Sequence, residues 1–450
     1  MSFPPRLRAR RAFPGEAMAQ ALFADPKGKI YDHPSLEAAG ASGTDPSRIP
    51  AEDLLPVPEG TRFFHLPGSR PIAFDPSLDA FSTLGRVPVG RRKVTPLAVA
   101  CFLPPGYTRT HLPAAHYPGP SPYLPLWAYT ACGFAAGRFV AAAVRVDPVD
   151  HSEPHHYDDR EILPRVEATL RQHPENRLWK QLKVCALAYH CLAAKNAFLG
   201  RWEMPLPASA SCNADCVGCI SLQPAGACQA SHERVLYRLT AGEVIEAAVP
   251  HLREAEDAIV SFGQGCEGEP LLQVDLLEAV IRGLREKTDA GTINCNTNGS
   301  SAAAVTRLAR AGLDSIRVSL NAARPETYTP YYRPRNYGWQ DVADAIAAAT
   351  ANGVFTSINL LVFPGVTDRE EEAEALFALI RRTGLHMVQM RNLNIDPRLY
   401  LGAVPPPRGK VLGIRRLLRL LRKEFAHVEI GYFNRPKALF DRRLCEQLPL

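Results

Sequence analysis

Long hydrophobic runs are missing from this sequence of 450 residues. The longest candidate, TACGFAAGRFVAAAVRV at 130–146, is interrupted by Arg138, and a membrane-spanning helix needs about 18 or more consecutive apolar residues. We therefore expect no membrane anchor, and we interpret this run as a buried strand or another part of the core. The first residues also lack the apolar segment of a secretory signal, which predicts a cytoplasmic protein.

A strong charge of either sign is missing as well. The net charge is +6, with 22% charged and 46% hydrophobic residues, which is the ordinary composition of a folded globular protein. This balance neither requires nor excludes a nucleic-acid partner. The basic run RLRARR at 6–11 is interpreted as a solvated arm, with organelle targeting as the alternative.

Cysteine, in contrast, is not scarce. The sequence contains 11 cysteines, an odd number, spread along a long chain without a secretory signal. A disulfide framework is therefore not expected, and thiols kept reduced for metal binding or catalysis fit better. Most of the scattered cysteines are interpreted as small buried residues; these are Cys101, Cys132, Cys185, Cys191, Cys266 and Cys295.

The order of segments predicts a β-rich N-terminal domain over 1–160, a helical connector over 161–204, a barrel over 205–400, and a C-terminal helix and tail over 401–450 that pack on the barrel. Short β-type runs separated by Pro and Gly turns indicate the first domain, which could recognise a macromolecular substrate or dock a partner. These runs are TRFFHL at 61–66, PLAVACFL at 96–103 and LPLWAYTA at 124–131.

Strand-like and helical segments alternate after Thr240, a pattern that calls for a parallel sheet or barrel. In several of these strands one side-chain parity is polar, as in Asn294, Asn296 and Asn298, whereas a parallel sheet between two helix layers is apolar on both faces. We therefore predict an α/β fold with a partial (β/α)6-type barrel around a polar cavity; the alternative is a core of mutually bonded polar groups. The predicted strands are 258–263, 292–299, 315–321, 355–363 and 387–395.

Three cysteines with C-x3-C-x2-C spacing, Cys212, Cys216 and Cys219, stand in one loop directly after the first predicted barrel strand. This spacing alone is short enough to arise by chance. Four further stretches accompany it, each at or near the end of a predicted strand: GCEGEP at 265–270, NTNGS at 296–300, RVSLNAA at 317–323 and INLLVFPGVTDREE at 358–371.

Together these stretches resemble the radical S-adenosylmethionine (SAM) superfamily, in particular its molybdopterin-biosynthesis and peptide-modifying branches. GCEGEP is similar to the GGEP motif of that family, and the other stretches are similar to its TNG, VSLD and INxVVxPGVND segments. The resemblance implies that Cys212, Cys216 and Cys219 hold three irons of one [4Fe-4S] cluster and leave the fourth iron for SAM. It also implies reductive cleavage of SAM to methionine and a 5'-deoxyadenosyl radical, which abstracts hydrogen from a substrate.

The same resemblance implies the partners. A radical SAM enzyme needs a one-electron donor of the flavodoxin or ferredoxin type. The branches that this chain resembles act on nucleotides, peptides and protein side chains, so the substrate stays open among a peptide or protein, a nucleotide and a small molecule.

Site residues follow from the resemblance together with the strand parity. The SAM contacts expected are Gly268, Glu269 and Pro270 around the amino group, and Asn296, Asn298, Ser319 and Asn321 around the ribose and carboxylate. The substrate candidates are Arg333, Asn359, Gln389, Arg391, Asn394 and Cys266. Arg333 could instead be an exposed helix-entry arginine, and Asn394 could serve only in a cap or turn.

The sequence departs from the family pattern at three places. Gly218 stands where an aromatic residue often packs on adenine, so the Ile220 and Leu222 side of the loop is expected to replace it. Glu267 stands where the first glycine of GGEP is usual. Cys445 stands alone after Cys295, so auxiliary clusters of the SPASM branch are not expected and we predict a single cluster.

Zinc is the competing interpretation of the loop, because Cys228 and His232 follow closely and could complete a tetrahedral site. That reading predicts a regulatory or RNA-binding protein without catalysis. A second histidine-rich segment, DHSEPHHYDD with His151, His155, His156 and Asp158, is interpreted as a solvated loop rather than a metal site.

The helix at 408–425 is expected to pack its Leu and Ile stripe on the barrel and to point its arginines outward, with binding to a membrane surface as the alternative.

Overall fold

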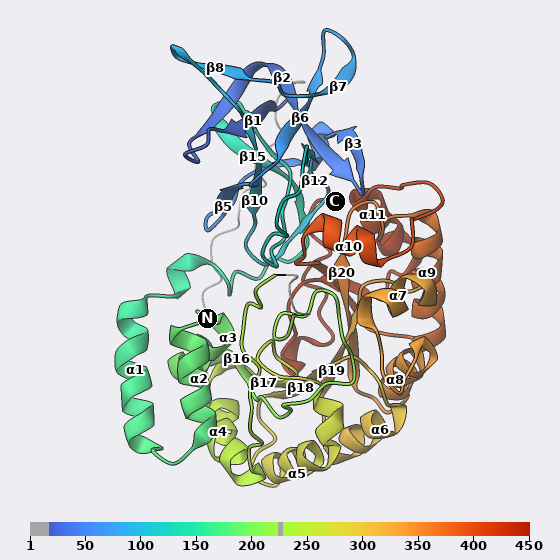
Figure 1. Ribbon diagram of the computed structural model, residues 1–450. Coiled ribbons are helices and arrows are strands. Elements are labelled where there is room, and N and C mark those ends of the chain that lie inside the picture. The colour runs from blue at the N-terminus through green and yellow to red at the C-terminus, as the bar shows by residue number, and fades with distance from the viewer. Residues whose placement is uncertain (1–17, 224–227) are drawn as a thin grey trace.

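The computed structural model describes residues 18–223 and 228–450, and the basic run at 6–11 lies outside them. A β-rich domain lies at one end of the molecule and a sheet surrounded by helices forms the other end (Figure 1). Within the described residues no helix is both long and apolar enough to cross a membrane.

The N-terminal domain consists of antiparallel strands, which confirms the predicted β-rich region. The run at 130–146 folds as the hairpin β14–β15, whose turn uses positive φ at Ala136 and Gly137. The prediction of a strand over 124–131 is wrong, because that segment is irregular except for a bridge between Thr130 and Cys101. The strands are β1 (Gln20–Ala24), β2 (Ile30–Ser42), β3 (Asp45–Arg48), β4 (Leu54–Pro56), β5 (Arg62–His65), β6 (Arg70–Asp75), β7 (Ala80–Thr83), β8 (Val87–Val89), β9 (Arg92–Val94), β10 (Leu97–Phe102), β11 (Tyr107–Arg109), β12 (Leu112–Pro113), β13 (Ala115–His116), β14 (Cys132–Ala135) and β15 (Arg138–Arg145).

Three helices connect this domain to the barrel: α1 (Asp159–Gln172), α2 (Arg177–Leu187) and α3 (Leu192–Leu199). The side chains of Asp158 and Asn176 cap α1 and α2 by accepting a backbone N–H two residues ahead. The expected connector is thus helical.

The C-terminal half contains a seven-stranded sheet in which every neighbouring pair is parallel. Its order is that of the chain, from β16 to β22, and each of these two edge strands has a single neighbour. The predicted partial barrel is therefore confirmed. The strands are β16 (Arg201–Pro205), β17 (Glu256–Phe262), β18 (Thr292–Thr297), β19 (Ser315–Leu320), β20 (Phe355–Val362), β21 (Met387–Asn392) and β22 (Glu429–Gly431).

Helices cover the outer side of this sheet, and Figure 1 shows α4, α5, α6, α8 and α9 along the periphery of the molecule. Each buries an apolar stripe, as α5 does with Leu277, Val280, Ile281 and Leu284. The helices are α4 (Ala241–Glu254), α5 (Val274–Arg285), α6 (Ala302–Ala311), α7 (Pro325–Tyr332), α8 (Trp339–Ala351), α9 (Glu370–Thr383), α10 (Pro397–Ala403) and α11 (Ile414–Glu424).

The C-terminal segment does more than the expected packing of a helix and tail. It supplies β22, a strand of three residues that is too short for alternation to reveal. The arginines of α11 do not all point outward as expected: Arg415 donates to Asp53 at 2.8 Å and Arg419 to Glu52 at 2.7 Å. This helix therefore joins the barrel to the N-terminal domain.

The lower part of the barrel interior is a packed layer of polar groups. The side chain of Asn294 donates to Ser261 at 3.0 Å and accepts from Ser315 at 2.9 Å. Mutual bonding of polar residues, the alternative considered from the sequence, thus holds for this layer, and the cavity begins above it.

Buried contacts also hold the N-terminal domain on the barrel. Thr108 donates to the carbonyl of Met390, and Arg109 donates to the carbonyl of Leu393 at 2.8 Å, so β11 lies against the carboxyl end of β21. Below, Asp147 accepts from the guanidinium of Arg435 at 2.9 Å and from the backbone N–H of Tyr432 at 2.8 Å. All of these partners are buried.

We expect Asp147→Ala to lower the free energy of unfolding by about 3 kcal/mol or more, because Arg435 would keep a buried charge with half of its ionic partners removed. The measurement is urea unfolding followed by circular dichroism. Asp275→Ala is the matched control, since Asp275 forms an exposed ion pair with Arg307 and exposed pairs contribute little. Equal effects of the two substitutions would contradict a supporting role for Asp147.

Candidate active site

A cavity of about 330 Å³ opens at the carboxyl ends of the barrel strands. Its lining comes from the cysteine loop, the turn after β17, the ends of β18 to β21 and the α7 region. Twelve of the residues singled out from the sequence line it together: Cys212, Cys216, Cys219, Gly268, Glu269, Pro270, Asn296, Asn298, Ser319, Asn359, Arg391 and Asn394.

The cysteine loop is held between two backbone segments. On one side, the N–H groups of Gly268 and Glu269 donate to the carbonyls of Ser209 and Ser211 at 2.7 and 2.8 Å. Gly268 is required there, because a Cβ atom would lie 2.0 Å from the carbonyl oxygen of Ser211. On the other side, the N–H of Val217 donates to the carbonyl at the end of α7 at 2.9 Å.

Glu267 explains one departure from the family pattern. Its carboxylate accepts N–H groups from Ala208 at 2.7 Å and Ser209 at 2.9 Å, and from Gly263 and Gln264 of the turn after β17. Burial raises the pKa of Glu267 to about 7, and these four N–H groups oppose that shift. The unexpected glutamate thus connects the chain that enters the cysteine loop to the adjoining turn.

Glu269 lines the cavity, but its carboxylate is hydrogen-bonded to other groups of the protein. It accepts from the N–H groups of Leu271 and Asn298 at 2.9 and 2.8 Å and from the hydroxyl of Thr297. Burial raises the pKa of Glu269 to about 7 against these bonds. The side chain that the sequence assigned to the amino group of SAM therefore fixes the end of β18. Since the N–H groups of Gly268 and Glu269 bind the cysteine loop, only backbone carbonyls of this turn are left for a ligand.

Among the other expected SAM contacts, the geometry differs from residue to residue. Asn298 donates to Asn213 of the cysteine loop at 2.7 Å, and Asn296 donates to the carbonyl of Phe262 at 3.0 Å. Ser319 is half-buried and faces the cavity. Asn321 does not line the cavity, because its amide donates to Tyr400 and to the carbonyl of Thr327, both at 3.1 Å.

Three of the substrate candidates are not brought to this cavity. Arg333 is exposed, as the alternative expected, but it ends α7 with a φ of 47° and does not stand at a helix entry. Cys266 is buried, and its thiol meets Cys185 of α2 on the outer side of the sheet. Gln389 lies deeper in the barrel and donates to Asn434 at 3.0 Å.

The substrate candidates that do reach the cavity are Asn359, Arg391 and Asn394. Asn359 is 8% exposed, and its side-chain oxygen has no hydrogen-bond partner. A buried amide oxygen without a partner is costly, so it is available for a ligand.

Tyr331 of α7 was missed from the sequence and accounts for Gly218. A Cβ atom at 218 would lie 2.8 Å from the hydroxyl of Tyr331, which is buried and lines the cavity. The space next to the third cysteine is therefore filled by an aromatic ring from another element. Of the two residues expected to replace the missing aromatic, Ile220 lines the cavity, whereas Leu222 is exposed and does not.

Arg234 is a second residue that was missed. It donates to the thiol of Cys219 at 3.7 Å and to the hydroxyl of Ser221 at 3.3 Å. No sequence signal pointed to it, because it stands in an irregular segment 15 residues beyond Cys219. Its positive charge lowers the pKa of Cys212, although burial, the larger effect, raises it.

The donor set fits a cluster better than a single metal ion. All three cysteines of the loop line one cavity, yet among the described residues no three of Cys212, Cys216, Cys219, Cys228 and His232 have ligand atoms within 4.8 Å of one another. A tetrahedral zinc site would hold its sulfurs about 3.8 Å apart, given Zn–S bonds of about 2.3 Å. A cubane spreads its thiolates further, because each binds a different iron.

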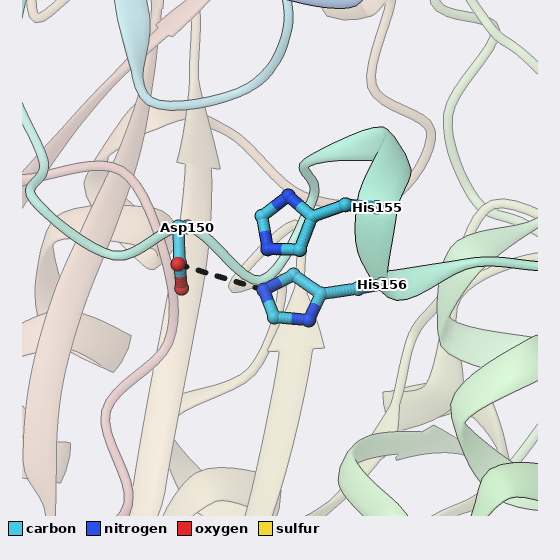
Figure 2. Close-up of side chains that lie close together, drawn as sticks. All are labelled: Asp150, His155 and His156. Atoms are coloured by element: carbon cyan, nitrogen blue, oxygen red, sulfur yellow. Dashed lines mark ion pairs between the residues drawn. The ribbon is translucent and has the colours of Figure 1, made fainter.

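A second group of potential ligands lies outside this cavity, in the histidine-rich segment (Figure 2). Asp150, His155 and His156 have ligand atoms within 4.8 Å of one another, and the ion pair between His156 and Asp150 measures 3.5 Å. His151 instead stacks on Trp202. Asp150 and His155 are exposed, and exposed side chains of these types often approach one another without an ion, which agrees with a solvated loop.

Residues 206–377 match the family model of the radical SAM superfamily. Two curated relatives are GTP 3',8-cyclases. The one from Limosilactobacillus fermentum is 31% identical over 132 residues, which are 29% of this chain and 37% of the relative. The one from Paenarthrobacter nicotinovorans is 32% identical over 29% of this chain and 36% of the relative. This chain thus spans little more than a third of their length.

Some solved structures are similar to part of this chain at low identity. A radical SAM methyltransferase from Sphaerobacter thermophilus is 20% identical, with a TM-score of 0.38 over 55% of this chain and 70% of that one. Streptococcus suis SuiB bound to S-adenosylmethionine is 15% identical, with a TM-score of 0.37 over 62% of this chain and 57% of that one. At these scores neither likeness bears on the chemistry of this chain.

We expect Glu267→Ala to release the cysteine loop, because four buried N–H groups would lose their acceptor. The substitution should destabilise the folded loop by about 3 kcal/mol or more, since each hydrogen bond contributes roughly 1 kcal/mol. Hydrogen exchange of residues 208–219 should accelerate, as measured by mass spectrometry of the purified protein. Glu254→Ala, at an exposed position of α4, should leave that exchange unchanged, and the same result for Glu267→Ala would contradict the assigned role.

Gly218→Ala should destabilise the protein by about 1 to 3 kcal/mol, the usual effect of overpacking, because the new methyl group meets the Tyr331 hydroxyl. Tyr331→Phe removes that hydroxyl, so the double variant should recover much of the loss. Thermal unfolding of the two single variants and the double variant gives the coupling. Strictly additive effects would show that the two residues do not compete for one space.

Proposed function

We propose that the whole chain is a radical SAM enzyme that acts on a substrate held inside the barrel, because residues 206–377 match the family model of the radical SAM superfamily. Enzymes of this superfamily use a [4Fe-4S] cluster and SAM. The observation that carries the proposal is the convergence of Cys212, Cys216 and Cys219 with the Gly268 to Pro270 turn on one cavity, at the carboxyl ends of parallel strands.

In this proposal the three thiolates bind the cluster and this loop leaves one iron to SAM. The cluster and SAM together would supply one-electron reductive cleavage of the sulfonium, followed by hydrogen-atom abstraction. The chain itself binds and orients. The backbone carbonyls of Gly268 to Pro270 and the hydroxyl of Ser319 would hold SAM, and the free oxygen of Asn359 would hold the substrate.

The surroundings of the cavity would keep water from the reaction. Tyr331 and Tyr332 are buried beside the cysteine loop, and the N-terminal domain lies against Asn392 and Leu393 at the rim. Such enclosure protects reactive species from the solvent. We propose that this domain also restricts which substrates reach the barrel.

The partners belong to the same proposal. The enzyme would take an electron from a flavodoxin- or ferredoxin-like protein in the cytoplasm. GTP, which the names of the relatives specify, is the first compound to test, and peptides follow. A non-catalytic zinc or RNA-binding role is not favoured, because residues 206–377 match the family model of the radical SAM superfamily.

The anaerobically reconstituted, reduced protein should cleave SAM to methionine and 5'-deoxyadenosine, quantified by liquid chromatography. Cys216→Ala should lower the iron and sulfide content and reduce cleavage at least 100-fold, because a three-thiolate site would lose a ligand. Cys228→Ala is the matched control and should keep both. Stoichiometric zinc without sulfide, or loss of metal in Cys228→Ala, would overturn the proposal.

A further inference from the structure

A second hollow of about 310 Å³ lies on the other side of the barrel interior. None of the three loop cysteines lines it; its walls come from β16, α3 and the segment after β22. Gln264, Arg317 and Arg391 line both hollows, so the two spaces meet at these side chains.

Arg317 projects from β19 to this meeting point and is 8% exposed. Its Nη1 donates to Gln389 at 3.4 Å, and its Nε has no hydrogen-bond partner. Among the described residues, no carboxylate lies within ion-pair distance of it. A buried guanidinium with a single long bond to a neutral amide is therefore aimed at the space where the hollows join.

The other buried arginines that the structure describes form more bonds, although the Nε of Arg109 also has no partner. Arg435 ends on the carboxylates of Asp147 and Glu429, both at 2.9 Å. Arg109 ends on the carbonyls of Tyr129 and Leu393 at 3.1 and 2.8 Å. A buried charge is normally paired in one of these ways. Arg317 is buried but not paired in this way, so its guanidinium is free to bind an anion.

A second guanidinium faces the same space. Arg391, on β21, lies over the ring of Tyr432 at 5.1 Å and forms no ion pair with another described residue. Burial, together with the charge of Arg391, lowers the pKa of Arg317 to about 9, which means that the two arginines repel each other. With this pKa Arg317 remains charged at neutral pH.

Glu203 and Tyr432 are the other titratable groups whose charges reach Arg317. Glu203 receives the amides of Gln264 and Asn434 at 2.7 and 2.8 Å, and neither arginine is within ion-pair distance of it. Arg317 and Arg391 are the charged residues that line both hollows, whereas Glu203 and Asp257 line only the second.

We propose that Arg317 and Arg391 form an anion-binding subsite that holds a phosphate or carboxylate group of the substrate. Guanidinium forks bind both groups by paired, charge-assisted hydrogen bonds. The rest of the substrate would extend toward the cysteine loop. That the anion belongs to the substrate rests on the proposed radical SAM function.

The depth of the subsite separates it from SAM. Arg317 precedes Ser319 by two residues on the same face of β19, so it lies further from the strand end where the cysteine loop sits. It also reaches the second hollow, which the cysteines do not line.

The test measures binding of sodium phosphate, pyrophosphate and succinate to the full chain without reconstitution, by isothermal titration calorimetry at constant ionic strength. At least one probe should bind, and Arg391→Gln or Arg317→Gln should weaken it about 10- to 100-fold, the range for hydrogen bonds to charged groups. Tighter binding of pyrophosphate indicates a phosphate-bearing substrate, and tighter binding of succinate a carboxylate-bearing one. Arg310→Gln, an exposed position on α6, should bind as the wild type does.

Binding of none of the probes to the wild type, or equal losses in Arg310→Gln, would overturn the subsite. SAM binding to reconstituted Arg391→Gln, measured by equilibrium dialysis, should stay within about twofold of the wild type. A tenfold loss there would overturn the assignment to substrate, because the pair would then serve the carboxylate of SAM. Failure of the proposed function is distinguishable, since SAM cleavage would be absent while anion binding persisted.

Discussion

The carboxylate of Glu267 is the constraint on which the site depends. It receives backbone N–H groups from Ala208, which is 59 residues earlier in the sequence, and from the turn after β17. These bonds fix where the chain leaves β16 and therefore where Cys212 begins its loop. The turn that carries Gly268 is fixed by the same carboxylate, so cysteines and turn are placed relative to each other without help from a ligand. This arrangement needs no movement of backbone N–H groups when a cofactor binds.

The barrel interior changes character with depth. Near its floor, Asn294, Ser261 and Ser315 satisfy one another, and a closed network of this kind stabilises a single packed arrangement. Above it, Asn359 has a free oxygen and Arg317 a free Nε. Below this depth the polar side chains bind one another, and above it polar atoms without a protein partner are free to bind a ligand. The two arginines lie at this boundary, and the cysteines lie above it.

The N-terminal domain and the C-terminal segment act on the site together. Asp147 of the first domain binds Arg435, which also binds Glu429 of β22. The residue before Arg435, Asn434, enters the barrel and contacts Glu203 and Gln389. Placement of a lumen side chain thus depends on a carboxylate from a different domain. At the other contact, β11 holds Asn392 and Leu393 at the rim of the cavity, so the same domain shapes both hollows.

The sequence by itself determined the class of fold and the chemistry of the loop. Alternation of strands and helices, the polar parity of residues such as Asn294 and Ser319, and the spacing of Cys212, Cys216 and Cys219 are local patterns, and local patterns are readable in one dimension. The sequence could not show that the Glu269 carboxylate is hydrogen-bonded at the end of β18, that Asn321 donates to Tyr400, or that Cys266 lies outside the cavity. Those outcomes depend on which partner lies within 3 Å or so in space. Only the tertiary structure decided three features: Tyr331 beside Gly218, the three-residue β22 and the unpaired Arg317. Each is defined by contacts between segments far apart in the chain. The identity of a side chain does not specify whether its neighbours in space will leave it without a partner.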